Sequence, residues 1–352
     1  MSAFWRLCVA AAAALAAAWL INGGGPPPVE FLSPEPAPPA TPAPAAVKLT
    51  GPAPAPVRYA YEPHCNDGTD GCRHHILVSA TGQQWWLEGA HDDAPFALSS
   101  DGTLVVHPLG DRFVARDLTT GTVTKLPVKT EESVGEIFGS QQPLLSLDGR
   151  HLLVQHDHLD EDVEVVLERP MIVDIRRGTV RRLPKGERVA GWTTEGLALV
   201  TDHPARDLPG YATSAAYVIR SPGGRVVRRF TVPGNLAHGL PSPSARTLAT
   251  LAKEIAPHDV VSTGILLTGT GNGKTLRTVV PRLPEGLRAD ALIRWEGEDA
   301  LLVRAEDRHG KISYHVVDLA TGAARDLRVA MAAVSDYLLA PAELSVLIGS
   351  VR

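Results

Sequence analysis

The sequence lacks the short motifs that identify most enzymes. It contains no G-x-S-x-G nucleophile motif, no H-E-x-x-H zinc motif, no C-x-x-C pair, and no G-x-G-x-x-G between a strand and a helix. Any catalytic site would therefore have to be assembled from loops that are far apart in the chain.

Positive charge is also scarce. The 352 residues include 34 Lys and Arg against 39 Asp and Glu, which gives a net charge of −5 at pH 7. Nucleic-acid binding depends on a basic surface, so this balance argues against a nucleic-acid partner. No cofactor motif is present, and we expect neither a cofactor nor a bound nucleotide.

One stretch, GILLTGTGNGKTLRTVV at Gly264–Val280, comes close to a phosphate-binding loop but fails on two counts. The pattern G-x-x-x-x-G-K-[ST] needs a glycine five positions before Gly273, where the sequence has Thr268. The residues after Lys274 alternate as in a strand, whereas a phosphate loop opens a helix. We therefore predict a β-hairpin whose turn, Gly271-Asn272-Gly273, takes left-handed backbone at glycine and asparagine.

The same hairpin recurs along the chain. Each copy is an apolar strand, a polar turn with glycine, and a second alternating strand. The other copies lie at His75–Gly89, Val114–Val128, Met171–Pro184, Ala216–Pro233 and Tyr314–Val329. In three of them an aspartate (Asp117, Asp174 or Asp318) precedes the turn, where its carboxylate can accept backbone N–H groups.

A second repeat lies between these hairpins and has an acidic-Gly turn, or a variant of it, between two short strands. Its turn positions are Asp101, Asp148, Glu195, Ser244, Gly297 and Pro341, in steps of 47, 47, 49, 53 and 44 residues. A sustained period of about 48 residues with four strands per period is typical of a β-propeller. The sequence therefore predicts an all-β, six-bladed propeller over residues 57–352, with irregular blades where Ser244 and Pro341 replace the acidic residue.

The chain ends predict how the ring closes. The last inner hairpin, Tyr337–Ile348, has no outer hairpin after it, and the first outer hairpin, His75–Gly89, has no inner hairpin before it. We expect Leu344–Val351 to pair with His75–Ala80, so that both chain ends build one blade and no open edge remains.

The combined pattern, lSxDGrxLlv followed by vvDlxtGxvrxLp, resembles the repeats of TolB-like and WD40-like propeller proteins. The resemblance covers about residues 65–352. It implies the propeller fold and no particular activity, because this architecture hosts many unrelated functions.

The first 56 residues have a different character. Arg6 precedes the apolar run Leu7–Ile21, which predicts a signal sequence or a retained membrane anchor over residues 1–22. Residues 23–56 are rich in proline and alanine and predict a disordered, extended linker. The propeller is then expected outside the cytoplasm, anchored to the membrane, or secreted if the first segment is cleaved.

Cys65 and Cys72 bracket the loop NDGTDG just before the first outer hairpin. In an oxidising compartment they are expected to form a disulfide. A zinc site formed with His64, His74 and His75 is an alternative, although C-x6-C is wider than the usual spacing. A calcium site in the same loop lacks the regular D-x-D-x-D-G frame.

Long loops between the second and third strands of several blades are expected on one face of the ring. Repeat proteins commonly bind ligands on the face that carries such insertions. The candidate residues on these loops are His156, Asp157, His158, Asp160, Asp162, His203, Asp207, His258, Asp259, Asp307 and His309. They are either solvated loop residues, ligands of a metal near His156 and His158, or members of a catalytic carboxylate pair.

Two functions are compatible with these features. The first is a non-enzymatic, membrane-tethered extracytoplasmic propeller that binds a protein or another component of the cell envelope. The alternative is an extracytoplasmic hydrolase or lyase that acts on a carbohydrate or lactone at the central channel. The channel lining distinguishes them, because convergent carboxylates and histidines favour the enzyme and an apolar lining favours binding.

Overall fold

A computed structural model describes residues 46–61, 74–91, 94–130, 143–154, 157–159, 165–167, 169–184, 187–204, 212–236, 238–256, 259–329 and 347–349. The predicted signal or anchor, most of the predicted linker, and both Cys65 and Cys72 lie outside these residues. No helix in the described ranges is long and apolar enough to cross a bilayer.

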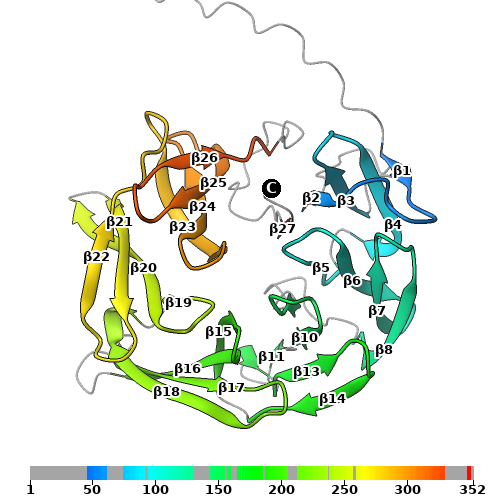
Figure 1. Cartoon of the computed structure of the whole chain (residues 1–352), viewed down its shortest axis with the longest axis horizontal. Coiled ribbons are helices and arrows are strands. Elements are labelled where there is room, and N and C mark those ends of the chain that lie inside the picture. The colour runs from blue at the N-terminus through cyan, green and yellow to red at the C-terminus, as the bar shows by residue number, and fades with distance from the viewer. Residues whose placement is uncertain are drawn as a thin grey trace, which may run out of the picture. The chain divides into compact units, whose positions relative to one another are not determined.

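Six β-sheets of the described chain are arranged as blades around a central axis (Figure 1), which confirms the predicted six-bladed propeller. A seventh sheet has two strands and belongs to no blade. Blades two to six are antiparallel sheets built in sequence order from the inner strand outward. Blade two contains β5 (Ala97–Leu98), β6 (Leu104–Leu109), β7 (Arg112–Asp117) and β8 (Val123–Lys129). Blade three contains β9 (Leu144–Leu145), β10 (His151–Val154), β13 (Met171–Asp174) and β14 (Thr179–Arg182).

The remaining blades follow the same plan. Blade four contains β15 (Arg188–Thr193), β16 (Gly196–Pro204), β17 (Ala212–Arg220) and β18 (Val226–Pro233), followed by the short helix η2 (Gly234–Leu236). Blade five contains β19 (Leu240–Pro241), β20 (Thr247–Ala256), β21 (Asp259–Gly269) and β22 (Thr275–Val279). Blade six contains β23 (Arg288–Trp295), β24 (Ala300–Glu306), β25 (Ile312–Asp318) and β26 (Ala324–Asp326).

Both ends of the chain contribute to blade one. Its strands, from the outer edge inward, are β1 (Val47–Lys48), β4 (Gln84–His91), β3 (His74–Ser79), β2 (Val57–Tyr61) and β27 (Leu347–Ile348). Closure by both ends is thus confirmed, but the predicted partner strand is wrong. β27 pairs with β2, because the run VRYAY supplies the second strand of this blade and lies between β27 and β3.

The end of the predicted linker belongs to the propeller. Val47 and Lys48 of β1 pair in parallel with Trp85 and Trp86 of β4 in blade one. The following residues cross to blade two, where the N–H of Ala53 donates to the carbonyl of Leu118. Although its composition is rich in proline, this segment is therefore held to blades one and two by backbone hydrogen bonds.

Apolar clusters between neighbouring blades hold the ring together. Between blades five and six, for example, Trp295 and Val303 pack with Ala249 and Ile265. Similar clusters occupy each of the other five junctions. Full burial of one such aliphatic side chain stabilises the fold by roughly 1.5–3 kcal/mol, so each junction contributes substantially.

The aspartates before the outer turns act as predicted. Asp117 Oδ1 accepts the N–H groups of Thr119 and Thr120, at 2.8 and 3.1 Å. Asp174 and Asp318 accept backbone N–H groups in the same position of blades three and six. These bonds favour the ionised carboxylates, and the pKa of each of the three lies below its usual value, against the opposing effect of desolvation.

The hairpin prediction for Gly264–Val280 is confirmed. β21 and β22 pair in antiparallel register from Ile265↔Val279 to Thr268↔Thr275, and no helix follows the turn. One detail is wrong: among the three turn residues only Gly273 has left-handed backbone, with φ of 66°. The Asn272 side chain stabilises the turn differently, by accepting the N–H of Lys274 at 3.0 Å.

This hairpin predicts how the turn tolerates substitution. Lys274 is exposed, so Lys274→Ala should change the free energy of unfolding by no more than about 0.5 kcal/mol. Gly273→Val should cost about 1–2 kcal/mol, because valine opposes left-handed backbone. Gly271→Val is the matched control and should cost less, since Gly271 has ordinary backbone and open space around its Cα. Chemical denaturation measures all three, and stabilisation by ATP or GTP that Lys274→Ala abolishes would contradict the hairpin account.

Candidate functional site

The inner strands of the blades enclose a central channel with a cavity of about 300 Å³. Each blade contributes residues from its innermost strand or from the turn that follows it. The described lining residues are Ala97, Leu98, Ser100, Pro143, Leu144, Leu145, Ser146, Leu147, Val189, Ala190, Gly191, Trp192, Leu240, Pro241, Pro243, Ile293, Arg294, Trp295 and Ile348. The number of described lining residues differs between blades, from one in blade one to five in blade three.

The channel lining is predominantly apolar. Its described part includes no carboxylate and no imidazole. Leu144, Leu147 and Ile293 are large apolar side chains that remain 38–40% exposed there. Exposed apolar side chains gathered in a concave site are typical of a surface that binds another molecule.

Arg294 is the single charged side chain among the described lining residues, and it is fully engaged. Its Nε donates to Glu296 Oε1 at 2.6 Å, and its two terminal nitrogens donate to the carbonyls of Ile348 and Gly349. The guanidinium thus holds the closing strand β27 against blade six. Arg294 thus supports ring closure, and its charge is paired with that of Glu296.

Two tryptophans link neighbouring inner strands around the channel. Trp192 Nε1 donates to the carbonyl of Leu144 in the preceding blade, and Trp295 Nε1 donates to the carbonyl of Leu240, both at 3.0 Å. Each indole therefore satisfies its only polar group on the backbone and adds an apolar ring to the wall. Sequence analysis missed this role, although both tryptophans occupy a similar place in the repeat, three residues before Glu195 and two residues before Gly297.

The turns at the end of the inner strands form the rim of the channel. In blade two, Ser99 Oγ donates to Asp101 Oδ1 at 2.6 Å and accepts the N–H of Leu104 at 2.9 Å. Ser146 and Asp148 repeat this arrangement in blade three. Partial desolvation opposes ionisation of these carboxylates, but hydrogen bonds from the serine and from backbone N–H groups prevail, so the pKa of Asp101 and of Asp148 is lowered.

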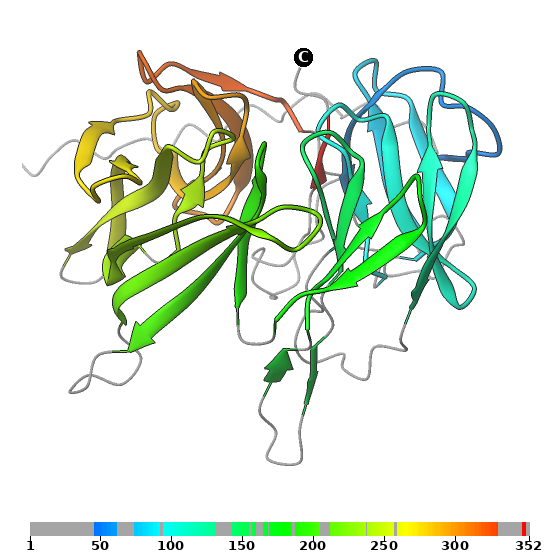
Figure 2. The same ribbon diagram turned by 60° about the horizontal axis from the view of Figure 1, so that its bottom comes forward.

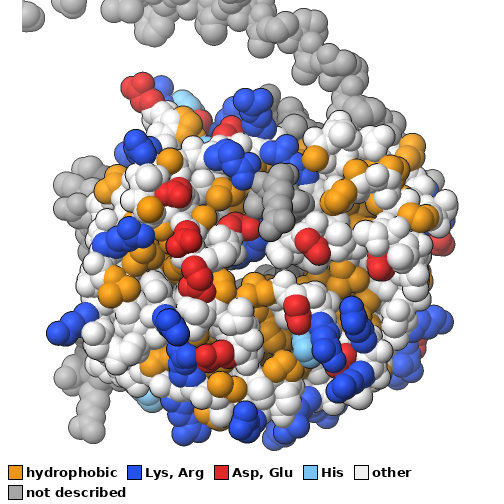
Figure 3. Space-filling model, viewed as in Figure 1, with side chains coloured by type: hydrophobic (Ala, Val, Ile, Leu, Met, Phe, Trp, Pro, Cys, Tyr) orange, Lys and Arg blue, Asp and Glu red, His pale blue; other side chains and the backbone are white. Residues whose placement is uncertain are grey.

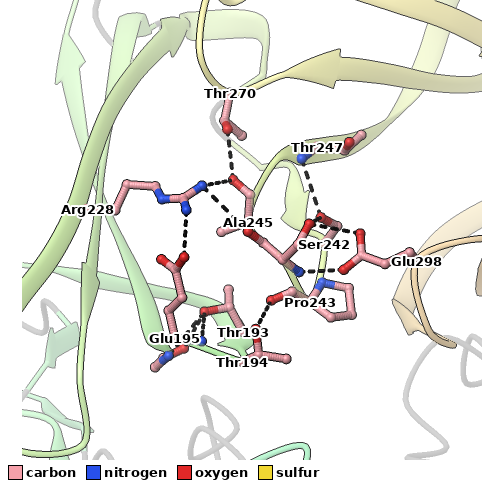
Figure 4. Close-up of polar contacts among 12 residues, drawn as sticks. Thr193, Thr194, Glu195, Arg228, Ser242, Pro243, Ala245, Thr247, Thr270 and Glu298 are labelled. Carbon is pink, nitrogen blue, oxygen red and sulfur yellow. Dashed lines mark hydrogen bonds and ion pairs between the residues drawn. The ribbon is translucent and has the colours of Figure 1, made fainter.

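The rim of blades four and five uses side chains from neighbouring strands instead (Figure 4). Arg228 donates to Glu195 at 2.6 Å and to the carbonyl of Ala245 at 3.1 Å, which joins the two blades. Ala245 occupies the position of the turn glycine and has left-handed backbone, with φ of 55°. Blade five is thus irregular at this turn, and register shifts occur between Ala252 and Lys253 and between Leu267 and Thr268, although all four strands pair.

Blade six supplies the carboxylate that blade five lacks. Glu298, in the inner turn of blade six, accepts the N–H of Ser244 and the Ser244 hydroxyl, the latter at 3.0 Å. Blade five has Ser244 at the turn position that aspartate holds in blades two and three, and Glu298 of blade six provides the carboxylate there instead (Figure 4). These rim carboxylates hold turns and join blades, so they are poorly placed to act as general acids or bases.

The loop residues predicted as a binding face are only partly described. His156, Asp160, Asp162, Asp207 and His258 lie outside the described residues. Asp157 and His158 belong to β11 (Asp157–Leu159), which pairs with β12 (Val165–Leu167), and Asp259 begins β21. Figure 2 shows the β11–β12 hairpin standing out from the ring at the far end of blade three.

The other candidates do not assemble into a site. His203 is exposed on β16, whereas Asp307 and His309 share a turn of blade six. Asp307 Oδ1 accepts the N–H groups of Lys311 and His309, which lower its pKa and fix the turn. No three His, Cys, Asp or Glu side chains in the described part of the chain are grouped so that they could hold a metal ion.

The contact between blades five and six predicts a compensating pair of substitutions. Glu298→Ala removes two hydrogen bonds to Ser244 and should lower the free energy of unfolding by about 1 kcal/mol. Ser244→Asp should recover most of this loss in the Glu298→Ala background, because it restores the serine–aspartate turn of blades two and three. In the parent chain Ser244→Asp should destabilise, since two carboxylates would then face each other.

A double-mutant cycle measured by chemical denaturation tests this coupling. Glu285→Ala, at an exposed glutamate of the β22–β23 connection, is the control. Additive effects of Ser244→Asp and Glu298→Ala would contradict the cross-blade replacement.

No family model matches the sequence, and no curated protein matches it either. Among solved structures, a putative TolB from Agrobacterium tumefaciens is 11% identical with a TM-score of 0.37, over 77% of this chain and 88% of that chain. An acylaminoacyl peptidase from Pyrococcus horikoshii is 12% identical with a TM-score of 0.44, over 72% and 41% of the two chains. Dipeptidyl peptidase 4 from Porphyromonas gingivalis is 12% identical with a TM-score of 0.36, over 66% and 39%. The chain thus spans about two fifths of the length of these two peptidases, and at such identities the likeness concerns the propeller fold alone.

Proposed function

We propose that this protein is a non-enzymatic binding propeller whose central channel receives an apolar segment of a protein partner outside the cytoplasm. The observation that carries the proposal is the channel lining. Its described side chains are apolar except for two serines and Arg294, and that arginine is bound to Glu296 and the closing strand.

The size and exposure of the channel support a side-chain ligand. A cavity of about 300 Å³ is at the lower end of the range for small-molecule pockets, about 300–1,000 Å³. It would accommodate a few apolar side chains of a partner. Leu144, Leu147 and Ile293 would lose their contact with water on binding, and each would contribute roughly 1 kcal/mol or more.

The enzymatic alternative receives less support from the same residues. Hydrolysis or elimination at a sugar or lactone requires a carboxylate, an imidazole or a metal beside the reacting bond. The described part of the channel lining presents none of these side chains. Of the rim carboxylates, Asp101 and Asp148 are engaged in turns and Glu195 pairs with Arg228.

The remaining parts of the proposal rest on the sequence. The apolar run Leu7–Ile21 after Arg6 supports export and a membrane tether, and the Pro/Ala-rich residues that follow support a stalk. The partner would then be a protein of the cell envelope or its surroundings.

Charge placed in the channel should abolish this binding. A photo-cross-linking amino acid at Leu144 should capture one protein in intact cells, identified by mass spectrometry. Leu147→Glu or Ile293→Glu should reduce the cross-link at least about tenfold, because a buried, unpaired carboxylate is costly. Leu276→Glu is the matched control, since Leu276 is 59% exposed on β22 of blade five, away from the channel lining, and it should leave the yield unchanged.

Two results would contradict the proposal. One is a cross-link whose yield is the same in the channel variants and in the Leu276→Glu control. The other is cleavage of a polysaccharide or lactone by the purified protein that Leu147→Glu or Ile293→Glu abolishes, which would favour the enzymatic alternative.

A further inference from the structure

The outer rim of blades three and four carries a group of exposed arginines. They lie in the β13–β14 hairpin and in the β17–β18 hairpin, and the set, here called the arginine rim, is Arg176, Arg177, Arg181, Arg182, Arg225 and Arg229. Figure 3 shows Lys and Arg side chains gathered at the lower right, where Figure 1 places β13 and β14. The protein thus has a local basic surface although its net charge is −5.

Most of this positive charge is not neutralised. Within the described part of the chain, only Arg177 of the six has a carboxylate within 4 Å, namely Asp174 at 4.0 Å. That carboxylate already accepts two backbone N–H groups and lies 3.6 Å from Arg150. By contrast, Arg220 and Arg228 of the same region form ion pairs at 2.9 and 2.6 Å.

The two hairpins form one continuous surface. A methyl group added to Gly224, in the β17–β18 turn, would lie 2.3 Å from Arg181 Nε. The guanidinium of blade three therefore lies directly against the backbone of blade four, next to Arg225. The rim is lined by arginine, whose planar guanidinium binds carboxylates in a bidentate manner more readily than lysine does.

β14 itself is an open edge. Among the described strands it ends the sheet of blade three and pairs only with β13, from Asp174↔Thr179 to Met171↔Arg182. All four of its residues are exposed. The N–H and C=O groups along the other side of such a strand are available to an added strand.

Blade one shows that an outer edge of this propeller accepts an extended segment. There β1 pairs in parallel with β4, and Lys48 forms a salt bridge with Glu88 at 2.8 Å. The added segment thus combines backbone pairing with a cross-strand charge pair. At β14 the charges of the propeller are positive, so the complementary segment is acidic.

We propose that β14 and the arginine rim form a docking surface for an acidic, extended segment of a partner protein. The segment adds a strand to blade three through backbone hydrogen bonds, and its carboxylates pair with the arginines. A peptide is favoured over other polyanions because only a peptide can use the open backbone edge. This surface is separate from the channel and does not depend on the binding proposed there.

The probe is a synthetic peptide of alternating glutamate and threonine, labelled for fluorescence anisotropy and added to the full chain at low salt. Arg176→Glu/Arg182→Glu should weaken its binding at least about tenfold, because two attractive contacts become repulsive. Arg277→Glu, on the outer strand of blade five, is the matched control and should leave binding unchanged. A peptide of the same sequence with a methyl group on every backbone nitrogen should also bind at least about tenfold more weakly, since it cannot donate backbone hydrogen bonds.

Thermal melting of each variant shows whether it is folded, and exposed charge reversals should leave the transition in place. Absence of binding by the glutamate–threonine peptide would overturn the proposal. Equal binding by the N-methylated peptide, or by single-stranded DNA of equal charge, would overturn it too, because the rim would then be a general polyanion surface.

Discussion

Two residue pairs between β27 and β2 convert a row of six sheets into a ring. Tyr59 pairs with Ile348 and Ala60 with Leu347, and no other strand among the described residues joins the end of the chain to its beginning. So short a ladder needs support from side chains. Arg294 provides it from blade six by binding the carbonyls of Ile348 and Gly349, and Arg58 of β2 reaches back to the carbonyl of Leu327. The apolar cluster around Tyr59, Tyr314 and Ile348 then seals the last junction.

The channel is a consequence of this closure. The inner strands of different blades line one channel because the ring is closed. The turns that follow them are fixed by serine–aspartate pairs or by contacts between blades, and the tryptophans bind the backbone of the preceding blade. Polar groups near the channel are thereby used for the architecture, and the surface left for a ligand is apolar. The binding function proposed for the channel rests on this difference between polar groups that fix the turns and apolar side chains that face the channel.

The repeat pattern was sufficient to predict the blade count and the outer hairpins, because periodic turns and alternating strands are local properties. Closure was predicted with the wrong partner, since VRYAY follows a proline-rich run and has no repeat signature of its own. The residues that line the channel could not be predicted, because inner strands such as Leu144–Leu145 and Leu240–Pro241 are too short for any periodicity. The arginine rim was hidden by the net charge, which averages over surfaces that lie on different blades. The candidate loop histidines and carboxylates were chosen because their side chains can bind metals or transfer protons. The sequence could not show which of them lie together, and His203 and Asp307 belong to different blades.

The pairing of β27 with β2 is the central claim, and a designed disulfide tests it most directly. Cysteines at Tyr59 and Ile348 would replace a directly paired couple, with Cα atoms about 4.5–5.5 Å apart, in a chain whose native cysteines are changed to serine. Cysteines at Val78 and Ile348 are the control, because Val78 pairs with Tyr59 from the opposite side and lies about 10 Å from β27. Oxidation should cross-link the first pair within one chain and leave the second pair free, since a disulfide cannot span more than about 7 Å between Cα atoms. A cross-link between positions 78 and 348, or none between 59 and 348 in folded protein, would contradict the closure described here.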